Sequence, residues 1–275
     1  MILKRVSSLA LCLALSLMLC VHAAAAERSA NVVVDGKTAA ANATIEVIDQ
    51  NTYVAYWTVV KAMYPNATAS WENGQSVARA SGLTLCVKPG AKYIVANGRY
   101  LYVAGGVRQN NGNMMVPAWV LAKALGAKSG WDEATQSVCF QSGTGPIASG
   151  DRFYNADDLY WLSRIIHAES RGESLEGQIA VGNVVLNRVK SKEFPNTVSG
   201  VIFDRRHAVQ FEPVANGTLY QTPNTQSVEA AKRALDGESV VGNALYFYAP
   251  ALSQGTWINA NRVYHMTIGC HRFYL

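Results

Sequence analysis

The stretch DLYWLSRIIHAESRGESLEGQIAVGNVVLNRV, from Asp158 to Val189, decides how the second half of this chain folds. Apolar residues recur at helical spacing as far as Glu169, Gly172 follows closely, and a second apolar helical pattern then begins. The pattern predicts two helices joined by a short turn, because glycine favours a helix end. Asn155 is a candidate N-cap for the first helix. Glu169 continues the apolar stripe of that helix, so its carboxyl group is expected to be partly buried.

A partly buried carboxyl group at a helix end suits general acid catalysis. Apolar surroundings raise the pKa of such a group, and an acid that keeps its proton near neutral pH can protonate a glycosidic oxygen. The alternative is a structural ion pair between Glu169 and either Arg164 or Arg171, and the residues alone leave both open. Glu173 is expected at the edge of a cleft or near the start of the second helix.

The N-terminal segment has the features of an export signal. Lys4 and Arg5 precede an apolar run from Leu9 to Cys20, and the alanine-rich residues that follow offer cleavage sites near Ala26. We therefore predict a signal peptide at residues 1–26 and a protein that is secreted or held in the cell envelope. An uncleaved anchor is the alternative, and no later stretch is apolar enough to predict a stable membrane span.

Charge and cysteine content limit the possible functions. The formal net charge of +5 is mild, and loss of the basic signal residues lowers it, so no nucleic-acid partner is expected. Cys86 and Cys139 both lie in strand-like runs, where a disulfide and two buried free thiols are both open. A monomer without a cofactor is expected.

The sequence predicts two domains after the signal. Residues 141–151 are rich in Gly, Ser and Pro and lack any period, as linkers do. We place an N-terminal domain at residues 27–142, a linker at 143–152 and a C-terminal domain at 153–275. Each domain is long enough to bury its own core.

The N-terminal domain contains an internal repeat. The segment that starts at Tyr53 resembles the one that starts at Met115, and each is expected to form a short helix, a turn and a strand. Corresponding tryptophans mark the two copies: Trp57 matches Trp119, and Trp71 matches Trp131. The pattern resembles the copper amine oxidase N-terminal-like domain, a small α+β module, which implies an accessory or binding role. The segment contains no histidine, so no copper site is expected, and a folded spacer that binds nothing is the alternative.

The second half carries five ordered motifs, which are HAESRGE, GQIAVGNVVLNRV, QFEPVANG, ALYFYAP and IGCHRFY. Together they resemble the SleB/CwlJ family of cell wall hydrolases, which includes spore cortex-lytic enzymes. The resemblance implies a lysozyme-like fold, similar to resuscitation-promoting factors, that is mainly α with a small β portion. The predicted class of the whole chain is thus α+β. The family's catalytic acid falls on Glu169, and the implied substrate is the glycan strand of peptidoglycan.

The resemblance also implies lytic transglycosylation at the bond from N-acetylmuramic acid to N-acetylglucosamine. Glu169 would protonate the linking oxygen and then accept the proton of the muramoyl C6 hydroxyl, giving a 1,6-anhydro product. One carboxyl group suffices for this reaction, whereas hydrolysis commonly uses two. Hydrolysis assisted by Glu173 or by the substrate acetamido group is left open. The implied setting is wall remodelling or spore cortex lysis.

The remaining polar and aromatic residues of these motifs suit sugar recognition. Aromatic rings can stack on pyranose faces, and amide groups can bind acetamido groups. The predicted substrate-binding residues are Glu173, Asn187, Gln210, Tyr246, Tyr248 and His271. Core packing is the alternative for each aromatic residue, because the YFY run alternates as a strand does.

Two other classes of protein remain as alternatives. One is a wall-binding protein whose second domain is catalytically inactive. The other is a zinc-dependent wall peptidase, because His167, His207, His265 and His271 all lie in the second domain with Cys270. Their spacing does not match the usual ligand patterns, and no metal site is predicted.

Overall fold

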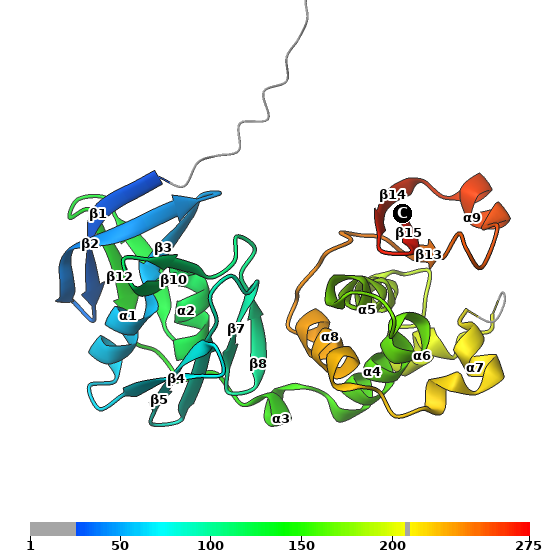
Figure 1. Ribbon diagram of the computed structural model, residues 1–275, viewed down its shortest axis with the longest axis horizontal. Coiled ribbons are helices and arrows are strands. Elements are labelled where there is room, and N and C mark those ends of the chain that lie inside the picture. The colour runs from blue at the N-terminus through cyan, green and yellow to red at the C-terminus, as the bar shows by residue number, and fades with distance from the viewer. Residues whose placement is uncertain (1–25, 207–209) are drawn as a thin grey trace, which may run out of the picture.

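The computed structural model describes residues 26–206 and 210–275 of the chain. The predicted signal peptide therefore lies outside the described residues, except for Ala26. Two domains follow one another along the chain and lie side by side, a β-rich domain and a mainly helical one (Figure 1). The predicted α+β class is confirmed, with most strands in the first half and most helices in the second.

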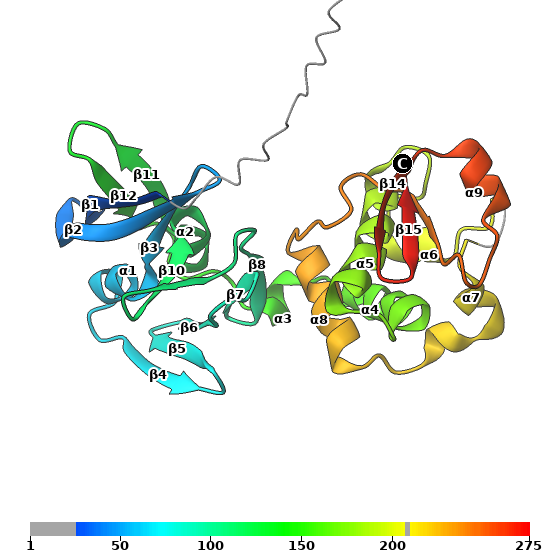
Figure 2. The same cartoon turned by 45° about the horizontal axis from the view of Figure 1, so that its top comes forward.

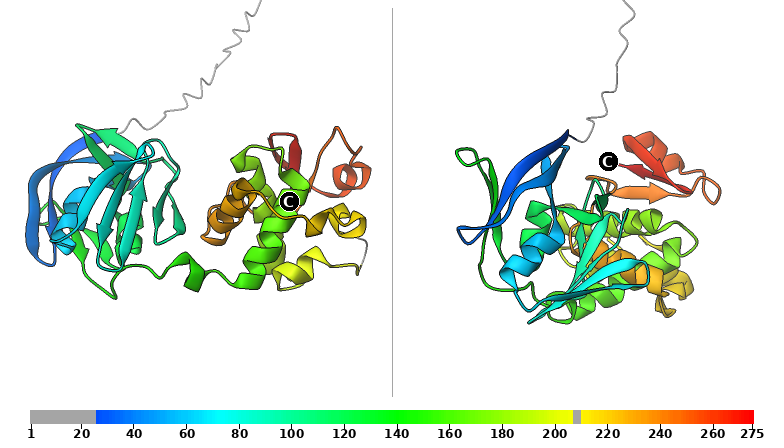
Figure 3. Two further views of the ribbon diagram at one scale, coloured as in Figure 1. Left: turned by 60° about the horizontal axis from the view of Figure 1, so that its bottom comes forward. Right: turned by 60° about the vertical axis from the view of Figure 1, so that its left-hand side comes forward.

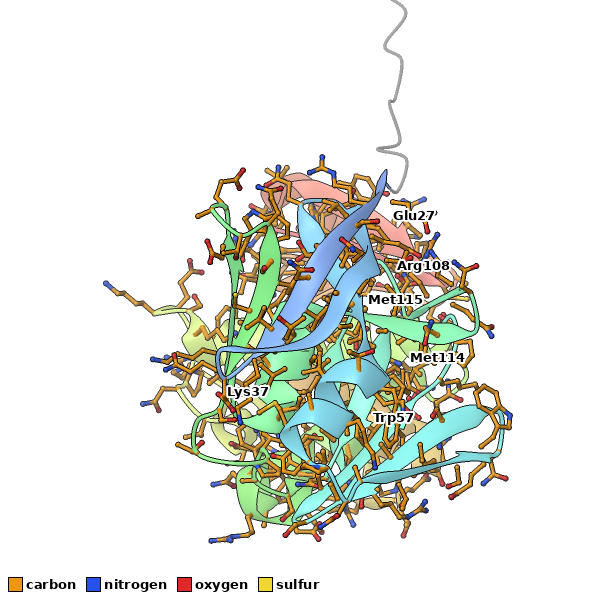
Figure 4. All side chains as sticks on the ribbon, turned by 90° about the vertical axis from the view of Figure 1, so that its left-hand side faces the viewer. Glu27, Lys37, Trp57, Arg108, Met114 and Met115 are labelled. Atoms are coloured by element: carbon orange, nitrogen blue, oxygen red, sulfur yellow. The ribbon has the colours of Figure 1, made fainter. Side chains whose placement is uncertain are left out.

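The larger sheet of the N-terminal domain has seven strands in the order β11-β12-β1-β2-β3-β10-β9. These are β1 (Ala26–Val34), β2 (Lys37–Ile48), β3 (Asn51–Ala55), β9 (Arg108–Asn110), β10 (Asn113–Pro117), β11 (Lys128–Asp132) and β12 (Ser137–Gln141). Figure 4 shows this end of the molecule, with Lys37 and Glu27 at opposite ends of the β1–β2 hairpin. The first strand pairs in parallel with β12, so the two ends of the domain are joined before the chain leaves it.

A second sheet of five antiparallel strands runs in chain order. Its strands are β4 (Thr68–Glu72), β5 (Gln75–Ala80), β6 (Leu83–Val87), β7 (Tyr93–Ala96) and β8 (Arg99–Tyr102). Helices α1 (Tyr56–Met63) and α2 (Ala118–Leu125) contribute residues to the same core as the strands. Alternating burial along β6 and β8 shows that one face of this sheet is packed and the other is more exposed.

The predicted repeat is present as two strand–helix–strand units. The first unit is β3, α1 and β4, and the second is β10, α2 and β11. Trp71 lies in β4 and Trp131 lies in β11, as the repeat predicts. The copies diverge afterwards, because β4 joins the five-stranded sheet whereas β11 joins the seven-stranded one.

The C-terminal domain is built mainly from helices. These are α4 (Ala156–Ser170), α5 (Leu175–Lys190), α6 (Val198–Ile202), α7 (Glu212–Asn216), the 3-10 helix η1 (Thr218–Tyr220), α8 (Thr225–Leu235) and α9 (Thr256–Asn261). A small sheet in the order β13-β15-β14 adjoins α5 (Figure 2). Its strands are β13 (Tyr246–Tyr248), β14 (Tyr264–Ile268) and β15 (His271–Tyr274). The predicted small β portion is therefore found in this domain.

Close packing of α4, α5 and α8 fixes the end of α4 where Glu169 lies. Ile165 and Ile166 are fully buried on the α4 face that meets this core. A Cβ atom on Gly182 of α5 would lie 2.9 Å from Ile166 Cδ1 and 3.4 Å from Ala234 Cβ, so glycine permits the close approach of the three helices. Asn155 caps α4 as predicted, since its side chain accepts hydrogen bonds from two backbone N–H groups.

A buried carboxylate, Asp236 at the end of α8, joins the two domains. It accepts hydrogen bonds from Arg99 Nε at 2.9 Å, from the second guanidinium nitrogen of Arg99, from the Tyr100 backbone N–H at 3.0 Å and from the Tyr154 hydroxyl. The side chain of Asp236 has no exposed surface, and that of Arg99 is 7% exposed. The Arg99 guanidinium also lies 3.2 Å from the centroid of the Phe153 ring. We call these residues the Asp236 junction.

The predicted linker is held against the N-terminal domain. Backbone N–H groups of Thr144, Ile147 and Gly150 donate to carbonyl groups of that domain. The chain then forms the short helix α3 (Gly150–Phe153) between the domains (Figure 3). The Asp236 junction and these backbone bonds together restrict how far one domain can turn against the other.

No disulfide bond joins the cysteines of the described residues. Cys86, Cys139 and Cys270 are free thiols, and Cys86 and Cys139 lie in different sheets, so the disulfide left open by the sequence is not formed.

Among the helices of the described residues, none has the length and apolar character needed to cross a membrane.

Substitution of Asp236 by asparagine should weaken the joined structure strongly. The variant keeps the size of the side chain but leaves the buried Arg99 guanidinium without a counter-charge. Breaking a buried pair in this way costs about 3–5 kcal/mol of unfolding free energy. Urea unfolding of the whole chain measures the loss.

A suitable control is Glu72→Gln, which removes a charge from the exposed Glu72–Arg79 pair. Its effect should be too small to resolve, because exposed pairs are screened by solvent. Equal stability of Asp236→Asn and the wild type would show that the junction does not hold the domains together.

Candidate active site around Glu169

Glu169 lies in the last turn of α4 with its side chain half-buried. The pKa of Glu169 is raised from 4.5 to about 7, mainly by burial and in addition by the nearby charge of Glu212, while the cation of Arg188 acts in the opposite direction. In the part of the chain that the structure describes, the carboxyl group has no hydrogen bond or ion pair. The group is therefore protonated in a large fraction of molecules at neutral pH, and its proton is not committed to another side chain.

The ion pairs that would give Glu169 a structural role are not formed. The Arg164 guanidinium lies 3.6 Å from the centroid of the Tyr160 ring and donates to the Tyr160 carbonyl. Arg171 is exposed at the end of α4. Neither arginine makes an ion pair with Glu169 in the described residues, which favours the general acid interpretation over the structural one.

Arg188 of α5 is the cation that faces Glu169. It is 5% exposed, and it donates from Nε to the Leu245 carbonyl at 2.7 Å and from Nη1 to Gln210 Oε1 at 3.3 Å. Its guanidinium also lies 5.5 Å from the centroid of the Tyr246 ring. Burial lowers the pKa of Arg188 to about 10, so the side chain keeps its charge at neutral pH. Arg188 thus links the catalytic candidate to the residues around it.

A groove of about 750 Å³ begins at Arg188. Its volume lies in the range of about 300–1,000 Å³ that is usual for small-molecule sites. The Tyr246 and Trp257 rings are 6.0 Å apart in its wall, and Arg262 lies within 5.0 Å of both ring centroids. The lining residues are Arg188, Glu193, Phe194, Asp204, Gln210, Tyr246, Phe247, Trp257, Ile258 and Arg262. Aromatic faces flanked by donors and acceptors suit a sugar chain.

Two of the predicted substrate-binding residues line this groove. Gln210 lies there with its side-chain oxygen bonded to Arg188, and Tyr246 lies there with its hydroxyl accepting a hydrogen bond from Arg262 at 2.8 Å. Tyr248, two residues further along β13, packs differently. Its ring stacks on Tyr274 at 5.8 Å, and its hydroxyl accepts from the Asn259 amide at 3.0 Å.

The other three predicted binding residues hold the small sheet in place. Glu173 lies near the start of α5, which is one of its two expected locations, and its Oε2 accepts the backbone N–H of Cys270 in the β14–β15 turn at 3.0 Å, while Ser174 caps the helix. Asn187 donates both amide hydrogens to backbone carbonyl groups, of Gly242 at 2.8 Å and Ala244 at 2.9 Å. His271 is 6% exposed, its ring centroid lies 5.3 Å from that of Phe247 in an edge-to-face arrangement, and burial lowers its pKa. These contacts hold the small sheet in position, and its strand β13 contributes Tyr246 and Phe247 to the wall of the groove.

Sequence reasoning missed three residues that the structure brings to the site. Glu212 begins α7 and acts on Glu169 through its charge. Arg188 and Arg262 line the groove but are not among the substrate-binding residues predicted from the sequence. A signal did exist for Glu212, because an acidic residue followed by proline in the QFEP motif is typical of a helix start.

Metal ligands do not gather in the described residues. No group of three or more His, Cys, Asp or Glu side chains there could hold a metal ion. His167 is 9% exposed, and its Nδ1 accepts the backbone N–H of Asn224 at 3.4 Å, which makes it a packing residue. His207 lies outside the described residues.

Comparison with known proteins finds a match to a family model in each half of the chain. Residues 172–274 match the family described as Cell Wall Hydrolase, and residues 33–140 match the copper amine oxidase N-terminal domain. The spore cortex-lytic enzyme of Bacillus cereus is 45% identical over 105 residues, covering 38% of this chain and 39% of that protein. The cell wall hydrolase CwlJ of Halalkalibacterium halodurans is 31% identical over 99 residues, covering 34% of this chain and 68% of that protein.

Among solved structures, the catalytic domain of the germination-specific lytic transglycosylase SleB from Bacillus anthracis is similar with 41% identity. The match covers 47% of this chain and 100% of the SleB catalytic domain, with a TM-score of 0.41. The chain belongs to the cell wall hydrolase family, and both predicted resemblances are confirmed. The chain spans about two fifths of the length of the spore cortex-lytic enzymes that it matches.

Replacement of Glu169 by glutamine should stabilise the fold at alkaline pH. The pKa of Glu169 is about 7 in the folded state and ordinarily 4.5, so the cost of burying the carboxylate develops as pH rises between these values. Above that window the cost is about 3 kcal/mol at most. Glu169→Gln should recover part of it at about pH 8 and little at about pH 4, where both states are protonated. Urea unfolding at the two pH values measures the difference.

Glu176→Gln serves as the control, since Glu176 is exposed in the first turn of α5. It should show no such pH-dependent gain. A Glu169→Gln protein less stable than the wild type at the alkaline pH would contradict the burial argument.

Proposed function

We propose that this protein cleaves the glycan strand of peptidoglycan as a lytic transglycosylase, with Glu169 as the catalytic acid and base. The observation that carries the proposal is a half-buried carboxyl group with a pKa of about 7 that interacts with Arg188, a residue of a groove lined by aromatic side chains. A general acid works best when its pKa lies near the working pH. Relatives whose names describe spore cortex lysis and lytic transglycosylation support the same substrate class.

In the proposed reaction Glu169 first donates a proton to the substrate and later accepts one from it. Protonated Glu169 donates to the oxygen between N-acetylmuramic acid and N-acetylglucosamine, and the bond from that oxygen to the muramoyl C1 breaks. The C6 hydroxyl of the same muramoyl unit then bonds to C1, and its proton passes to the Glu169 carboxylate. The products are a free N-acetylglucosamine hydroxyl end and a 1,6-anhydro muramoyl end, and no water is consumed.

The groove residues would support this reaction by binding the strand. Tyr246 and Trp257 offer ring faces to pyranose units, and Gln210 with Arg262 offers hydrogen-bonding groups at their edges. We further propose that Glu173, Asn187, Tyr248 and His271 act indirectly, by fixing the small sheet behind the groove, rather than by contacting sugar. The proposed setting is outside the cell membrane, in wall remodelling or cortex lysis, and the protein acts as a monomer without a cofactor.

Simple hydrolysis is the second candidate. The charge of Glu212 acts on Glu169, and a second carboxylate near the acid is what a hydrolase uses to activate water or to attack the sugar. Glu173 is less suited to that task, because its carboxylate accepts a backbone N–H of the β14–β15 turn. The two reactions differ in their products, so the products decide between them.

Glu169→Gln should reduce strand cleavage by roughly a hundredfold or more, because glutamine cannot donate the proton. Loss of turbidity of purified peptidoglycan measures the rate, and mass spectrometry identifies the ends released by the wild type. Anhydro ends, each lighter by one water than a hydrolysis product, are expected.

Glu176→Gln is again the matched control and should cleave at the wild-type rate. Wild-type activity in Glu169→Gln would remove the proposed mechanism. Reducing ends would favour the hydrolase, whereas cut peptides with intact strands and inhibition by a chelator would favour the zinc peptidase.

A further inference from the structure

Two exposed tryptophans of the N-terminal domain lie at one hollow. Trp119 in the first turn of α2 is 52% exposed, and Trp131 of β11 is 42% exposed. A shallow hollow of about 170 Å³ is lined by both, and its other residues are Gln50, Asn51, Thr52, Ala118, Ser129, Gly130 and Val138. The curved sheet makes this possible, since α2 contacts both β3 and β11 although these strands are not neighbours.

The two indole rings are held in fixed orientations. Trp119 Nε1 donates to Asn51 Oδ1 at 2.9 Å, and Trp131 Nε1 donates to Glu133 Oε2 at 2.6 Å. Among the described residues the two rings make no contact with each other. Each indole therefore has its polar atom satisfied while part of its apolar surface remains open, which lowers the entropy lost when a ligand stacks on it.

Gly130 of β11 is one of the residues that line the hollow. A Cβ atom there would meet nothing within 4 Å, and the backbone of Gly130 does not adopt a positive φ. Neither backbone conformation nor packing in the described structure therefore requires glycine at this position. Because side chains alternate along a strand, a side chain there would point to the face opposite Trp131, so Gly130 offers only its backbone to the hollow.

The chemistry of the lining identifies the kind of ligand. The residues combine two aromatic surfaces with the neutral polar side chains of Gln50, Asn51, Thr52 and Ser129, and none of the lining residues is charged. A pyranose ring matches this pattern, because its C–H face is apolar while its hydroxyl and acetamido edges form hydrogen bonds. The hollow is smaller than the roughly 300 Å³ at which sites enclose a ligand, so it suits one sugar ring lying on the surface.

We propose that Trp119 and Trp131 form an accessory binding site for an N-acetylated sugar unit of the peptidoglycan strand. The choice of strand rests on the proposed function of Glu169. The first repeat does not duplicate the site, because Trp57 of α1, the counterpart of Trp119, is partly buried against the core (Figure 4). Trp71, the counterpart of Trp131, is 60% exposed but lies in the other sheet.

The Asp236 junction would allow such a site to assist the second domain. It joins the two domains, so a long strand bound at the hollow stays attached to the molecule that carries the groove, which raises its effective concentration there. Weak binding at one sugar ring would then slow the release of an insoluble strand between cuts.

The test measures sedimentation of the full chain with insoluble peptidoglycan, in the Glu169→Gln background so that the wall is not degraded. Combined substitution Trp119→Ala and Trp131→Ala should weaken binding roughly tenfold, as truncation of aromatic anchors does. Trp119→Phe with Trp131→Phe should restore much of it, because ring faces remain. Thermal unfolding and circular dichroism check that each variant is folded.

Trp71→Ala is the matched control and should bind as the parent does. Unchanged binding of the double alanine variant, or equal weakening by Trp71→Ala, would overturn the proposed site. The failures of the two proposals are distinguishable, because activity of Glu169→Gln is detected separately by loss of turbidity, whereas the binding site is judged by comparing variants that all share the Glu169→Gln background. Quenching of fluorescence by soluble N-acetylglucosamine oligomers in the parent but not in the double alanine variant would support sugar as the ligand.

Discussion

The desolvation of one carboxyl group, that of Glu169, is the constraint on which the proposed chemistry depends. The group sits at the end of α4, whose apolar face is packed against α5 and α8. Packing that excludes water disfavours the ionised form, and the charge of Glu212 acts in the same direction. Arg188 opposes the shift from a buried position of its own and keeps the pKa near neutrality. The site therefore depends on a balance between burial, a like charge and an opposite charge.

Local sequence patterns predicted the helices around this group well. Apolar spacing placed the two helices and the partial burial of Glu169, and the cap at Asn155 follows from residue type. One detail differs: Gly172 does not adopt a positive φ, and the second helix begins instead with a cap at Ser174. The helix boundary is the same, but the capping serine rather than glycine geometry sets the turn.

Residues brought together from distant segments were harder to predict. Asp236 and Arg99 are 137 positions apart, and nothing in the residues around either indicates the other. Likewise the charge of Glu212 reaches Glu169 only because α7 and α4 pack together. Gln210 and Tyr246 were predicted from motif and residue type, whereas Asn187 and Glu173 have the right chemistry for sugar but bind backbone groups instead.

The two domains combine a site built on a rigid helical core with an accessory surface on a β-rich module. The N-terminal domain presents its exposed tryptophans from a repeat whose copies have diverged, so only the second copy places both rings at one hollow. The buried Asp236 junction joins the two domains, and the proposed account has them bind one long strand together. Such an arrangement suits an insoluble polymer, because an enzyme that stays bound to the polymer need not diffuse back to it after each cut.

The central claim, that Glu169 holds its proton near neutral pH, is tested most directly by nuclear magnetic resonance. Titration of the ¹³C-labelled glutamate carboxyl groups follows each group separately, and the Glu169 signal is assigned by its absence from Glu169→Gln. The account predicts a midpoint at about 7 that falls when Glu212 is replaced by glutamine. A midpoint near the ordinary value of 4.5, unchanged by that replacement, would contradict it.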